Sequence, residues 1–370
     1  MKILVLSCNT GGGHNAAAHA IVEQFARMGV PCEFRDALRF QSERTSRIVS
    51  DVYVRTVTAA PRVFGFGYRL AEAIGSPRYK SPVYFGNIPY ARAMYTYISE
   101  KRFDAVVMPH LFPAEAITHV KRRFGCAART YLVSTDYVCC PFFEETEVDR
   151  FCIPHAALRP EFVRRGIPDE KLAVTGIPVS ERYCTRMDRA GARRELGLDA
   201  PGRAILIMTG SMGFGNVERL IRPLMANLSA DDRVLVLGGN NEAMKRALRD
   251  KFRDDARVGV LDFTDRVDLY MDACDMLFTK PGGLTTTEAA VKGVPLVHTG
   301  PIPGCETLNL RFFGERGMSV SAESPEETVA KAIRLLNDPA ACRKMIERQR
   351  ENINPRAAQE ICELVLSDIG

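Results

Sequence analysis

The chain has 370 residues, of which 46% are hydrophobic, and a formal net charge of +5. This length is more than one hydrophobic core usually supports, so we expect two domains and no extensive disorder. No 18-residue apolar run is present, which excludes a membrane-spanning helix, and the apolar run after Met1 is too short for a signal peptide. Eleven cysteines without C-x-x-C spacing are typical of reduced thiols in a cytoplasmic protein, and the adjacent Cys139 and Cys140 are too isolated to predict a metal site.

Short apolar runs alternate with helix-like segments through the first half of the chain. The predicted strands are residues 2–6, 32–35, 104–108, 130–134, 151–153 and 172–175. Helical patterns follow the first strand, over about residues 14–28, and the third strand, after Pro113. Strands that alternate with helices indicate a parallel sheet covered on both faces.

The same alternation restarts after a Gly-Ile-Pro turn at residues 176–178. Its predicted strands are residues 204–208, 233–237, 258–261, 276–278 and 296–297. We therefore predict an α/β protein with two doubly wound, Rossmann-like domains that face each other across a cleft. The first would span residues 1–176 and the second 177–355, with an amphipathic helix at the C-terminal end, within 356–370.

One glycine-rich turn follows the first strand of each predicted domain. Gly11, Gly12 and Gly13 precede His14, and consecutive glycines are costly in conformational entropy, which favours a ligand close to the backbone. A plain strand-to-helix turn with an incidental histidine is the alternative. The second turn, residues 210–216, has backbone N–H groups that could bind a pyrophosphate.

The segment 278–309 is the most informative part of the chain. An apolar run ends in Lys280, Pro281 and two glycines, a threonine-rich helix start follows, and Glu288 lies one turn into that helix. The N–H groups of a helix start attract phosphate, and a carboxylate can accept hydrogen bonds from the hydroxyls of a ribose. A second apolar run then leads to a polar turn with Glu306 and Asn309. This arrangement predicts a site for a sugar nucleotide.

Together these patches resemble the glycosyltransferases that make monogalactosyl- and glucosyl-diacylglycerol, a family-28-like group with the GT-B fold. Residues 7–18 match the Gly-Gly-Gly-His loop of that family, and residues 278–309 match its donor-binding half. The chain more distantly resembles the N-acetylglucosaminyl transferase of peptidoglycan lipid synthesis. The resemblance covers most of the chain but is thin over about residues 38–101. It implies that the C-terminal helix crosses back onto the first domain.

The resemblance also implies roles for individual residues. His14 would be the base that deprotonates the acceptor hydroxyl, because inversion at the anomeric carbon needs such a group and imidazole titrates near neutral pH. Asp136 would orient His14 or act as an alternative base, although a carboxylate at a strand end is often only a cap. Gly11, Gly12 and Gly13 would form the acceptor loop. The expected donor-binding residues are Gly210, Ser211, Gly213, Gly215, Phe263, Lys280, Gly282, Gly283, Thr285, Thr286, Glu288, Glu306 and Asn309. For Phe263, a place in the hydrophobic core is an equal alternative.

The chain departs from the family pattern at two cysteines. Cys140 stands where the family has a histidine, and Cys305 stands where it usually has a glutamine. A thiol cannot replace the two hydrogen bonds of an amide, so we expect sugar selectivity to differ. The missing histidine argues against a second acting histidine at this position and would fit a subfamily with a different acceptor.

Residues 39–102 combine positive charge with aromatic side chains. The segment contains eleven Lys and Arg against four Asp and Glu, a balance of +7. It also contains the aromatic residues Tyr53, Phe64, Phe66, Tyr68, Tyr79, Tyr84, Phe85, Tyr90, Tyr95 and Tyr97. Two interpretations remain open: a helical insertion whose aromatic residues enter the core, or a surface that binds anionic lipid head groups.

We therefore predict an inverting transferase that moves glucose or galactose from a UDP-sugar to diacylglycerol. It would bind peripherally to the inner face of the cell membrane, without a metal, a cofactor or a nucleic-acid partner. One alternative is a hydrolysing UDP-N-acetylglucosamine 2-epimerase, which shares the two-domain layout. Another is a non-catalytic UDP-sugar sensor.

Overall fold

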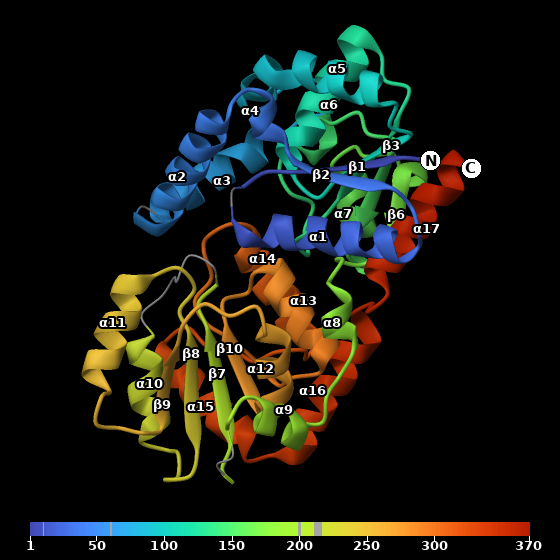
Figure 1. Ribbon diagram of the computed structural model, residues 1–370. Helices are drawn as coiled ribbons and strands as arrows, with labels where there is room; N and C mark the ends of the chain where they lie inside the picture. The colour runs from blue at the N-terminus through green and yellow to red at the C-terminus, as the bar shows by residue number, and fades with distance from the viewer. Residues whose placement is uncertain (10, 60, 199–200, 211–216) are drawn as a thin grey trace. The chain divides into compact units, whose positions relative to one another are not determined.

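The computed structural model describes residues 1–9, 11–59, 61–198, 201–210 and 217–370, and it divides the chain into two compact units (Figure 1). The first unit contains Met1–Glu181, Pro303–Cys305 and Asn354–Gly370. The second unit contains Arg182–Ile302 and Glu306–Ile353. The first unit is therefore built from three separate pieces of the chain.

A six-stranded parallel sheet forms the centre of the first unit. Its strands are β1 (Ile3–Ser7), β2 (Cys32–Asp36), β3 (Ala105–Met108), β4 (Arg129–Val133), β5 (Arg150–Ile153) and β6 (Leu172–Val174), in the order β2-β1-β3-β4-β5-β6. Every residue of β1 and β3 is buried, as is typical of a parallel sheet covered on both faces. The α-helices of this unit are α1 (Gly12–Arg27), α2 (Glu43–Ala59), α3 (Pro61–Ile74), α4 (Pro82–Asn87), α5 (Ala91–Lys101), α6 (Leu111–Phe124), α7 (Arg159–Arg164) and α17 (Ala357–Ile369).

The last helix, α17, belongs to the core of the first unit. It lies beside α1 on one face of the sheet (Figure 1). Ile361, Cys362 and Val365 are fully buried in the same cluster as Ile3 and Val5 of β1. Burying an aliphatic side chain of this size contributes about 1.5–3 kcal/mol, so α17 stabilises the unit through its apolar face.

A five-stranded parallel sheet forms the centre of the second unit. Its strands are β7 (Ala204–Met208), β8 (Arg233–Leu237), β9 (Val258–Leu261), β10 (Met276–Thr279) and β11 (Leu296–His298), in the order β11-β10-β7-β8-β9. The short helix α8 (Glu181–Cys184) connects the units. The helices that follow are α9 (Arg189–Glu195), α10 (Glu218–Met225), α11 (Glu242–Lys251), α12 (Val267–Ala273), α13 (Gly283–Lys292), α14 (Cys305–Glu315), α15 (Pro325–Leu336) and α16 (Pro339–Asn352).

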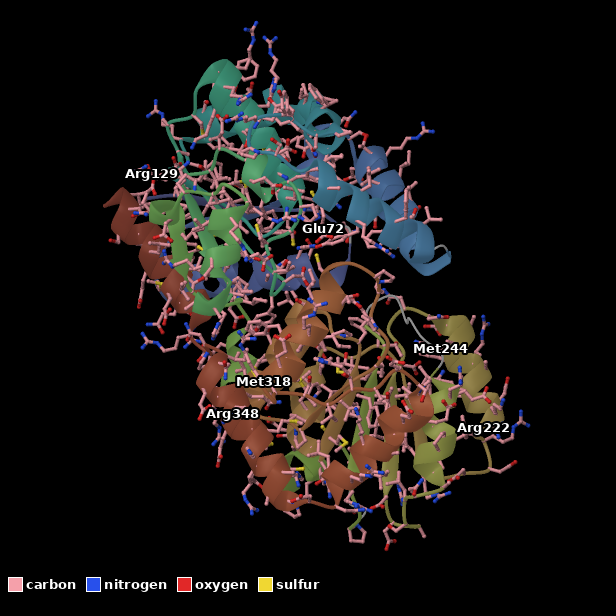
Figure 2. The ribbon with its side chains drawn as sticks, turned by 180° about the vertical axis from the view of Figure 1, so that it is seen from behind. Glu72, Arg129, Arg222, Met244, Met318 and Arg348 are labelled. Carbon is pink, nitrogen blue, oxygen red and sulfur yellow. The ribbon has the colours of Figure 1, made fainter. Side chains whose placement is uncertain are left out.

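Charged side chains cover the outer faces of these helices. Arg222 on α10 and Arg348 on α16 are both exposed (Figure 2). Arg222 donates to Glu218, four residues earlier, and Arg348 donates to Glu351, three residues later, each at 2.8 Å. Exposed pairs at this spacing add only a few tenths of a kcal/mol each, so they serve mainly to keep the outer faces hydrated.

The sequence-based prediction of the fold class is confirmed. Each of the eleven predicted strands is present, with ends that shift by no more than one residue. One local prediction was wrong, because Glu306 and Asn309 lie in helix α14 and not in a turn. Gly304, with φ of +118°, ends the preceding loop, and the carboxylate of Glu306 in the first turn favours helix formation through the helix dipole.

The aromatic segment 39–102 folds mainly as the four helices α2 to α5. Tyr84 and Tyr90 are buried, whereas Phe66, Tyr79 and Phe85 are exposed. The interpretation that places aromatic residues in the core therefore holds for part of the segment, and the lipid-binding interpretation stays a prediction. Across the described residues, each helix is either too short or too polar to cross a membrane.

Candidate active site

The topology of the first sheet brings three loops together around His14. Strand β1 lies between β2 and β3, so the connections after β1 and β3 leave in different directions, an arrangement that often forms a binding site. His14 lies in the first turn of α1. Its Nδ1 atom is 2.8 Å from the carbonyl oxygen of Pro109, which follows β3, and 3.0 Å from Oγ1 of Thr135, which follows β4.

The hydrogen bond to Pro109 defines the protonation of the neutral ring. A carbonyl oxygen only accepts, so Nδ1 of His14 carries the proton and Nε2 keeps its lone pair. Burial lowers the pKa of His14, and the bond to Pro109 partly opposes this shift. At neutral pH the imidazole is therefore uncharged and able to accept a proton at Nε2.

A second histidine, His110, supports this ring and was missed by the sequence analysis. Its ring centroid lies 4.4 Å from that of His14 in an edge-to-face arrangement. Nδ1 of His110 accepts the N–H of Phe112 at 3.0 Å and so caps α6. Burial, followed by the neighbouring His14, holds the pKa of His110 well below its ordinary value. The available signal was a histidine two residues after a buried strand, immediately before a helix.

Asp136 lies half-buried in the turn after β4. Its carbonyl oxygen accepts a hydrogen bond from Ser134 Oγ at 3.0 Å, which holds the turn closed. The preceding residue, Thr135, is the one that contacts Nδ1 of His14. Gly11 adopts φ of +132°, a backbone conformation that residues other than glycine rarely adopt. Helix α1 begins at Gly12, and Gly13 is its second residue.

The second sheet has its own switch point at β7, which lies between β10 and β8. Gly210 follows β7 with φ of +70°, and Lys280 follows β10. A Cβ atom at Gly210 would lie 2.9 Å from Cε of Lys280, so the glycine leaves the space that the lysine side chain occupies. The predicted donor residues Ser211, Gly213 and Gly215 lie outside the described residues.

Lys280 forms an ion pair with Glu306, and both side chains are largely buried. The other carboxylate oxygen of Glu306 accepts the N–H of Ile302 at 2.8 Å. Asn309 is fully buried, and its Nδ2 donates to the carbonyl oxygen of Pro281 at 2.9 Å. The structure thus brings together Lys280, Glu306 and Asn309, with Asn309 holding the turn that presents the lysine.

Helix α13 begins at this turn, and the first N–H groups of a helix have no partner within the helix itself. Gly282 is the N-cap residue, and among the described residues no side chain caps the helix. Gly283 is buried at its first position, and Thr285 is half-buried. Such a helix start favours an anion, because its first N–H groups and the helix dipole point at the ligand.

The hydroxyls of two threonines at the start of α13 contact other groups of the protein. Thr286 is fully buried, and its hydroxyl lies 3.2 Å from Nε2 of His298. Thr287 donates to the carbonyl oxygen of Gly283 at 2.6 Å. The hydroxyl of Thr286 therefore supports the fold of this turn, which is a different contact from the one that the sequence predicted.

Glu288 is buried beside two residues that the sequence analysis did not name. Burial raises the pKa of Glu288 to about 7, while the charge of Arg182 and a hydrogen bond from Tyr183 oppose the rise. Arg182 is itself held by its bond to the carbonyl oxygen of Asp265 at 2.8 Å. The carboxyl group therefore changes its charge near neutral pH. Tyr183 and Arg182 lie on short α8, about 105 residues before Glu288, and no local pattern connects them to it.

Phe263 is 79% exposed and follows the carboxyl end of β9. The alternative that places it in the hydrophobic core is wrong. An exposed aromatic ring at this edge of a parallel sheet is a suitable stacking surface for a base.

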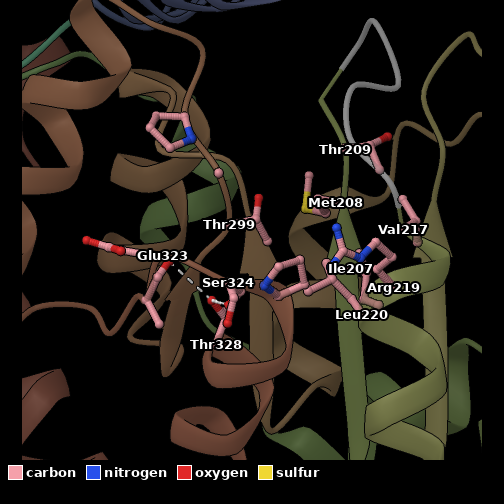
Figure 3. A pocket seen from close by; sticks show the side chains of 14 residues that line it. Ile207, Met208, Thr209, Val217, Arg219, Leu220, Thr299, Glu323, Ser324 and Thr328 are labelled. Atoms are coloured by element: carbon pink, nitrogen blue, oxygen red, sulfur yellow. Dashed lines mark hydrogen bonds between the residues drawn. The ribbon is translucent and has the colours of Figure 1, made fainter.

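A cavity of about 240 Å³ opens at the carboxyl ends of β7 and β11 (Figure 3). Thr209 and Thr299 lie at its two strand ends, and Arg219, Glu323 and Ser324 also line it. Thr209 immediately precedes Gly210, so the cavity borders the turn after β7 against which the Lys280 side chain packs. The sequence analysis did not predict it, because its walls combine residues 207–220 with residues 299–328, which are distant in sequence.

Two family models match the chain. The monogalactosyldiacylglycerol (MGDG) synthase model matches residues 14–179, and the model of glycosyl transferases group 1 matches residues 199–352. The chain is a glycosyltransferase. Its MGDG synthase domain carries His14, and its group 1 domain carries Lys280 and Glu288. The matches confirm the predicted family resemblance, and they do not favour the epimerase alternative.

Curated relatives match this glycosyltransferase over its full length. A processive diacylglycerol beta-glucosyltransferase of Bacillus subtilis strain 168 is 26% identical over 374 residues, which cover 100% of this chain and 94% of the relative. An enzyme of the same description from Staphylococcus saprophyticus is 27% identical over 375 residues, covering 99% and 92%.

Solved structures at lower identity share the fold. The MurG protein of Acinetobacter baumannii is 17% identical and has a TM-score of 0.64, and the match covers 99% of this chain and 99% of that one. The Anabaena HepE protein in complex with UDP is 13% identical and has a TM-score of 0.60, with 99% of this chain and 100% of that one covered. These likenesses support the GT-B fold.

Proposed function

We propose that this glycosyltransferase moves a hexose from a UDP-sugar to the free hydroxyl of diacylglycerol, with inversion at the anomeric carbon. The observation that carries the proposal is the setting of His14. Its Nδ1–H is directed to the Pro109 carbonyl oxygen, which leaves Nε2 as a base. The MGDG synthase match over residues 14–179 and the diacylglycerol specificity in the relatives' names support the acceptor.

The proposed reaction is a single displacement. The acceptor oxygen attacks the anomeric carbon while the bond from that carbon to the diphosphate oxygen breaks. The acceptor proton passes to Nε2 of His14, and the diphosphate leaves with its negative charge as part of UDP. General-base catalysis of this kind typically contributes 10²–10⁴-fold in rate.

The donor would be held by the second unit. The ammonium of Lys280 and the N–H groups at the start of α13 suit the two phosphates, whose charge increases as the bond to the sugar breaks. The carboxylate of Glu288 suits the ribose hydroxyls, and the exposed ring of Phe263 suits the uracil. Glu306 beside Lys280 suits a hexose hydroxyl.

A lipid acceptor lies in a membrane, so the enzyme needs a surface that contacts the membrane. Helices α2 and α3 offer such a surface. We define the apolar patch as the exposed side chains of Ile48, Val52, Val63, Phe66, Leu70 and Ile74. Arg44, Arg47 and Arg69 are exposed on the same two helices. Apolar side chains flanked by arginine are typical of surfaces that bind anionic lipid, so we propose peripheral attachment through this patch.

The test is transfer from radiolabelled UDP-glucose and UDP-galactose to diacylglycerol in mixed vesicles. We expect one of them to yield a labelled glycolipid, and His14→Ala to reduce the rate by at least 100-fold. The matched control is His19→Ala, because His19 is exposed on the same helix and contacts Phe34. If His14→Ala keeps activity within tenfold of the parent protein, the base assignment is wrong. If neither sugar is transferred, the proposed function is wrong.

A further inference from the structure

Two cysteines that are far apart in sequence meet in the first unit. The loop Pro303–Cys305 belongs to this unit, although the residues on both sides of it belong to the second. Sγ of Cys305 lies 3.5 Å from Sγ of Cys140, in the turn after β4. The carboxylate of Asp136 completes a group whose three ligand atoms all lie within 4.8 Å of one another.

The separation of the two sulfur atoms fits two ligands of one metal ion. Zinc–sulfur bonds are about 2.3 Å long, so two thiolates of a tetrahedral zinc site lie about 3.8 Å apart. The observed 3.5 Å is close to this value and is much longer than a disulfide bond of about 2.05 Å. A carboxylate is a common third ligand, with an oxygen about 2.0–2.2 Å from zinc.

We propose that Asp136, Cys140 and Cys305 form a binding site for one thiophilic divalent cation of the zinc type. Binding would remove the protons of both thiols and release them to solvent, because a thiolate is the form that binds metal. A water molecule would complete the tetrahedron. This site does not depend on the proposed transfer reaction.

The loop that carries Cys305 is shaped to reach this position. Gly304 has φ of +118°, and a Cβ atom there would lie 3.0 Å from the ring of Tyr68. Only glycine allows so close an approach in this backbone conformation. The thiol of Cys305 in turn lies 3.3 Å from the hydroxyl of Tyr68. Once the thiol is ionised, the Tyr68 hydroxyl can donate to it, which is the kind of outer contact that orients a metal ligand.

The turn that carries Cys140 is also held in place. The main-chain N–H of Cys139 donates to Glu161 at 2.9 Å, and Phe142 adopts φ of +71°. Without a metal, the hydrogen bond to Cys305, followed by burial, raises the pKa of Cys140 well above its ordinary value. A bound cation would reverse this preference, because it stabilises the thiolate.

The two cysteines are also the two positions at which the sequence departs from the family pattern. The sequence analysis considered only Cys139 with Cys140 and predicted no metal site. The structure pairs Cys140 with Cys305, 165 residues away, which spacing rules do not detect.

The test uses the full chain, reduced and freed of metal, and titrated with Zn²⁺ against a colorimetric chelator. We expect one tightly bound Zn²⁺ per chain, with affinity lowered at least tenfold in Cys140→Ser and in Cys305→Ser. The matched controls are Cys126→Ser and Cys184→Ser, which lie outside the cluster and should bind as the parent does. Circular dichroism checks that each variant is folded.

Cobalt provides a second readout that reports the ligands directly. Co²⁺ bound at this site should show thiolate-to-metal absorption in the near ultraviolet and the intense visible bands of tetrahedral coordination. Each serine variant should lose about half of the thiolate absorption. Asp136→Asn should weaken Co²⁺ binding but retain the full thiolate absorption of the bound complex. Equal Zn²⁺ affinity in all variants, or a Co²⁺ complex without thiolate absorption, would overturn the proposal. So would a Cys140–Cys305 disulfide in protein isolated with excess Zn²⁺.

Discussion

Nδ1 of His14 lies 2.8 Å from the carbonyl oxygen of Pro109, so the ring presents Nε2 as its basic atom. Because burial lowers the pKa of His14 from 6.5, the active neutral form predominates at pH 7. We therefore predict that kcat rises with pH through a midpoint below 6.5 and levels off above pH 7. The measurement is kcat at saturating donor and acceptor, so that donor binding does not contribute. A midpoint at or above pH 7 would contradict the role of His14.

Donor binding should have a different pH dependence, set by Glu288. Its pKa of about 7 means that the carboxylate is mostly protonated at pH 6 and mostly ionised at pH 8. Only the ionised form accepts hydrogen bonds with both oxygens, so UDP should bind about tenfold more tightly at pH 8 than at pH 6. Calorimetric titration with UDP measures this. Glu288→Gln should bind weakly at both pH values, and Glu326→Gln, at an exposed position, should behave as the parent. Affinities within twofold at the two pH values would exclude Glu288 as the ligand.

The ion pair of Lys280 and Glu306 predicts strong coupling between these two positions. Lys280→Met removes the cation from the diphosphate and leaves Glu306 unpaired, so kcat/KM should fall by about 30–100-fold. In the Lys280→Met variant, Glu306→Gln should lower kcat/KM much less than it does in the parent protein, because the effects of paired groups are not additive. Steady-state kinetics of the two single variants and the double variant give this coupling. Lys331→Met is the control, since Lys331 is exposed and bonds only to Ser321 among the contacts described. Additive effects would show that the two side chains act separately.

The raised pKa of Glu115 leads us to predict that the first unit loses stability as pH rises. Burial, together with the neighbouring Glu145, raises the pKa of Glu115 to about 10. The unfolded chain loses this proton near pH 4.5 and the folded chain keeps it, so stability decreases from about pH 5 toward pH 10. Glu115→Gln removes the titration, and we expect its Tm at pH 8 to exceed the parent's by about 4 °C or more, with a smaller difference at pH 5. Thermal unfolding at both pH values decides this, and an equal difference at both would contradict it.

The apolar patch on α2 and α3 predicts membrane binding that depends on both burial and charge. Phe66, 69% exposed, and Leu70 should enter the lipid boundary, so Phe66→Ser with Leu70→Ser should reduce binding to anionic vesicles by at least tenfold. High salt should weaken the parent protein's binding, since it screens the arginines. Cosedimentation with vesicles measures both effects. Val163→Ser on α7 is the control for an exposed valine outside the patch. Unchanged binding in the double variant would exclude the patch as the membrane contact.

The strands and the glycine-rich turns that follow the first strand of each domain could be predicted from the sequence, because each depends on local patterns. The run at 204–208, for example, is apolar throughout and has a glycine two residues after it, which is sufficient to place a buried strand and a tight turn. The same reasoning located His14, Lys280 and Glu288, since each lies within a few residues of such a turn. These are features of one segment at a time.

The partners of those residues could not be predicted, because they come from other segments. His110 reaches His14 only after β1 and β3 pair, and Tyr183 reaches Glu288 across about 105 residues. The hydroxyl of Thr286 faces His298 because α13 is buried on both sides, and a threonine-rich helix start does not reveal that. Burial and tautomer follow from packing, and packing requires the three-dimensional arrangement.

The placement of α17 in the core of the first unit has a consequence for synthesis on the ribosome. Ile361 and Val365 fill the space beside Ile3, so the N-terminal sheet lacks this packing until residues 357–369 have emerged from the ribosome. The strands of the second unit, which contains residues 182–302 and 306–353, are all synthesised before α17, so this unit can fold first. A premature stop just before Asn354 would therefore release a chain with one finished lobe and one lacking its closing helix, a ready substrate for chaperones and proteases.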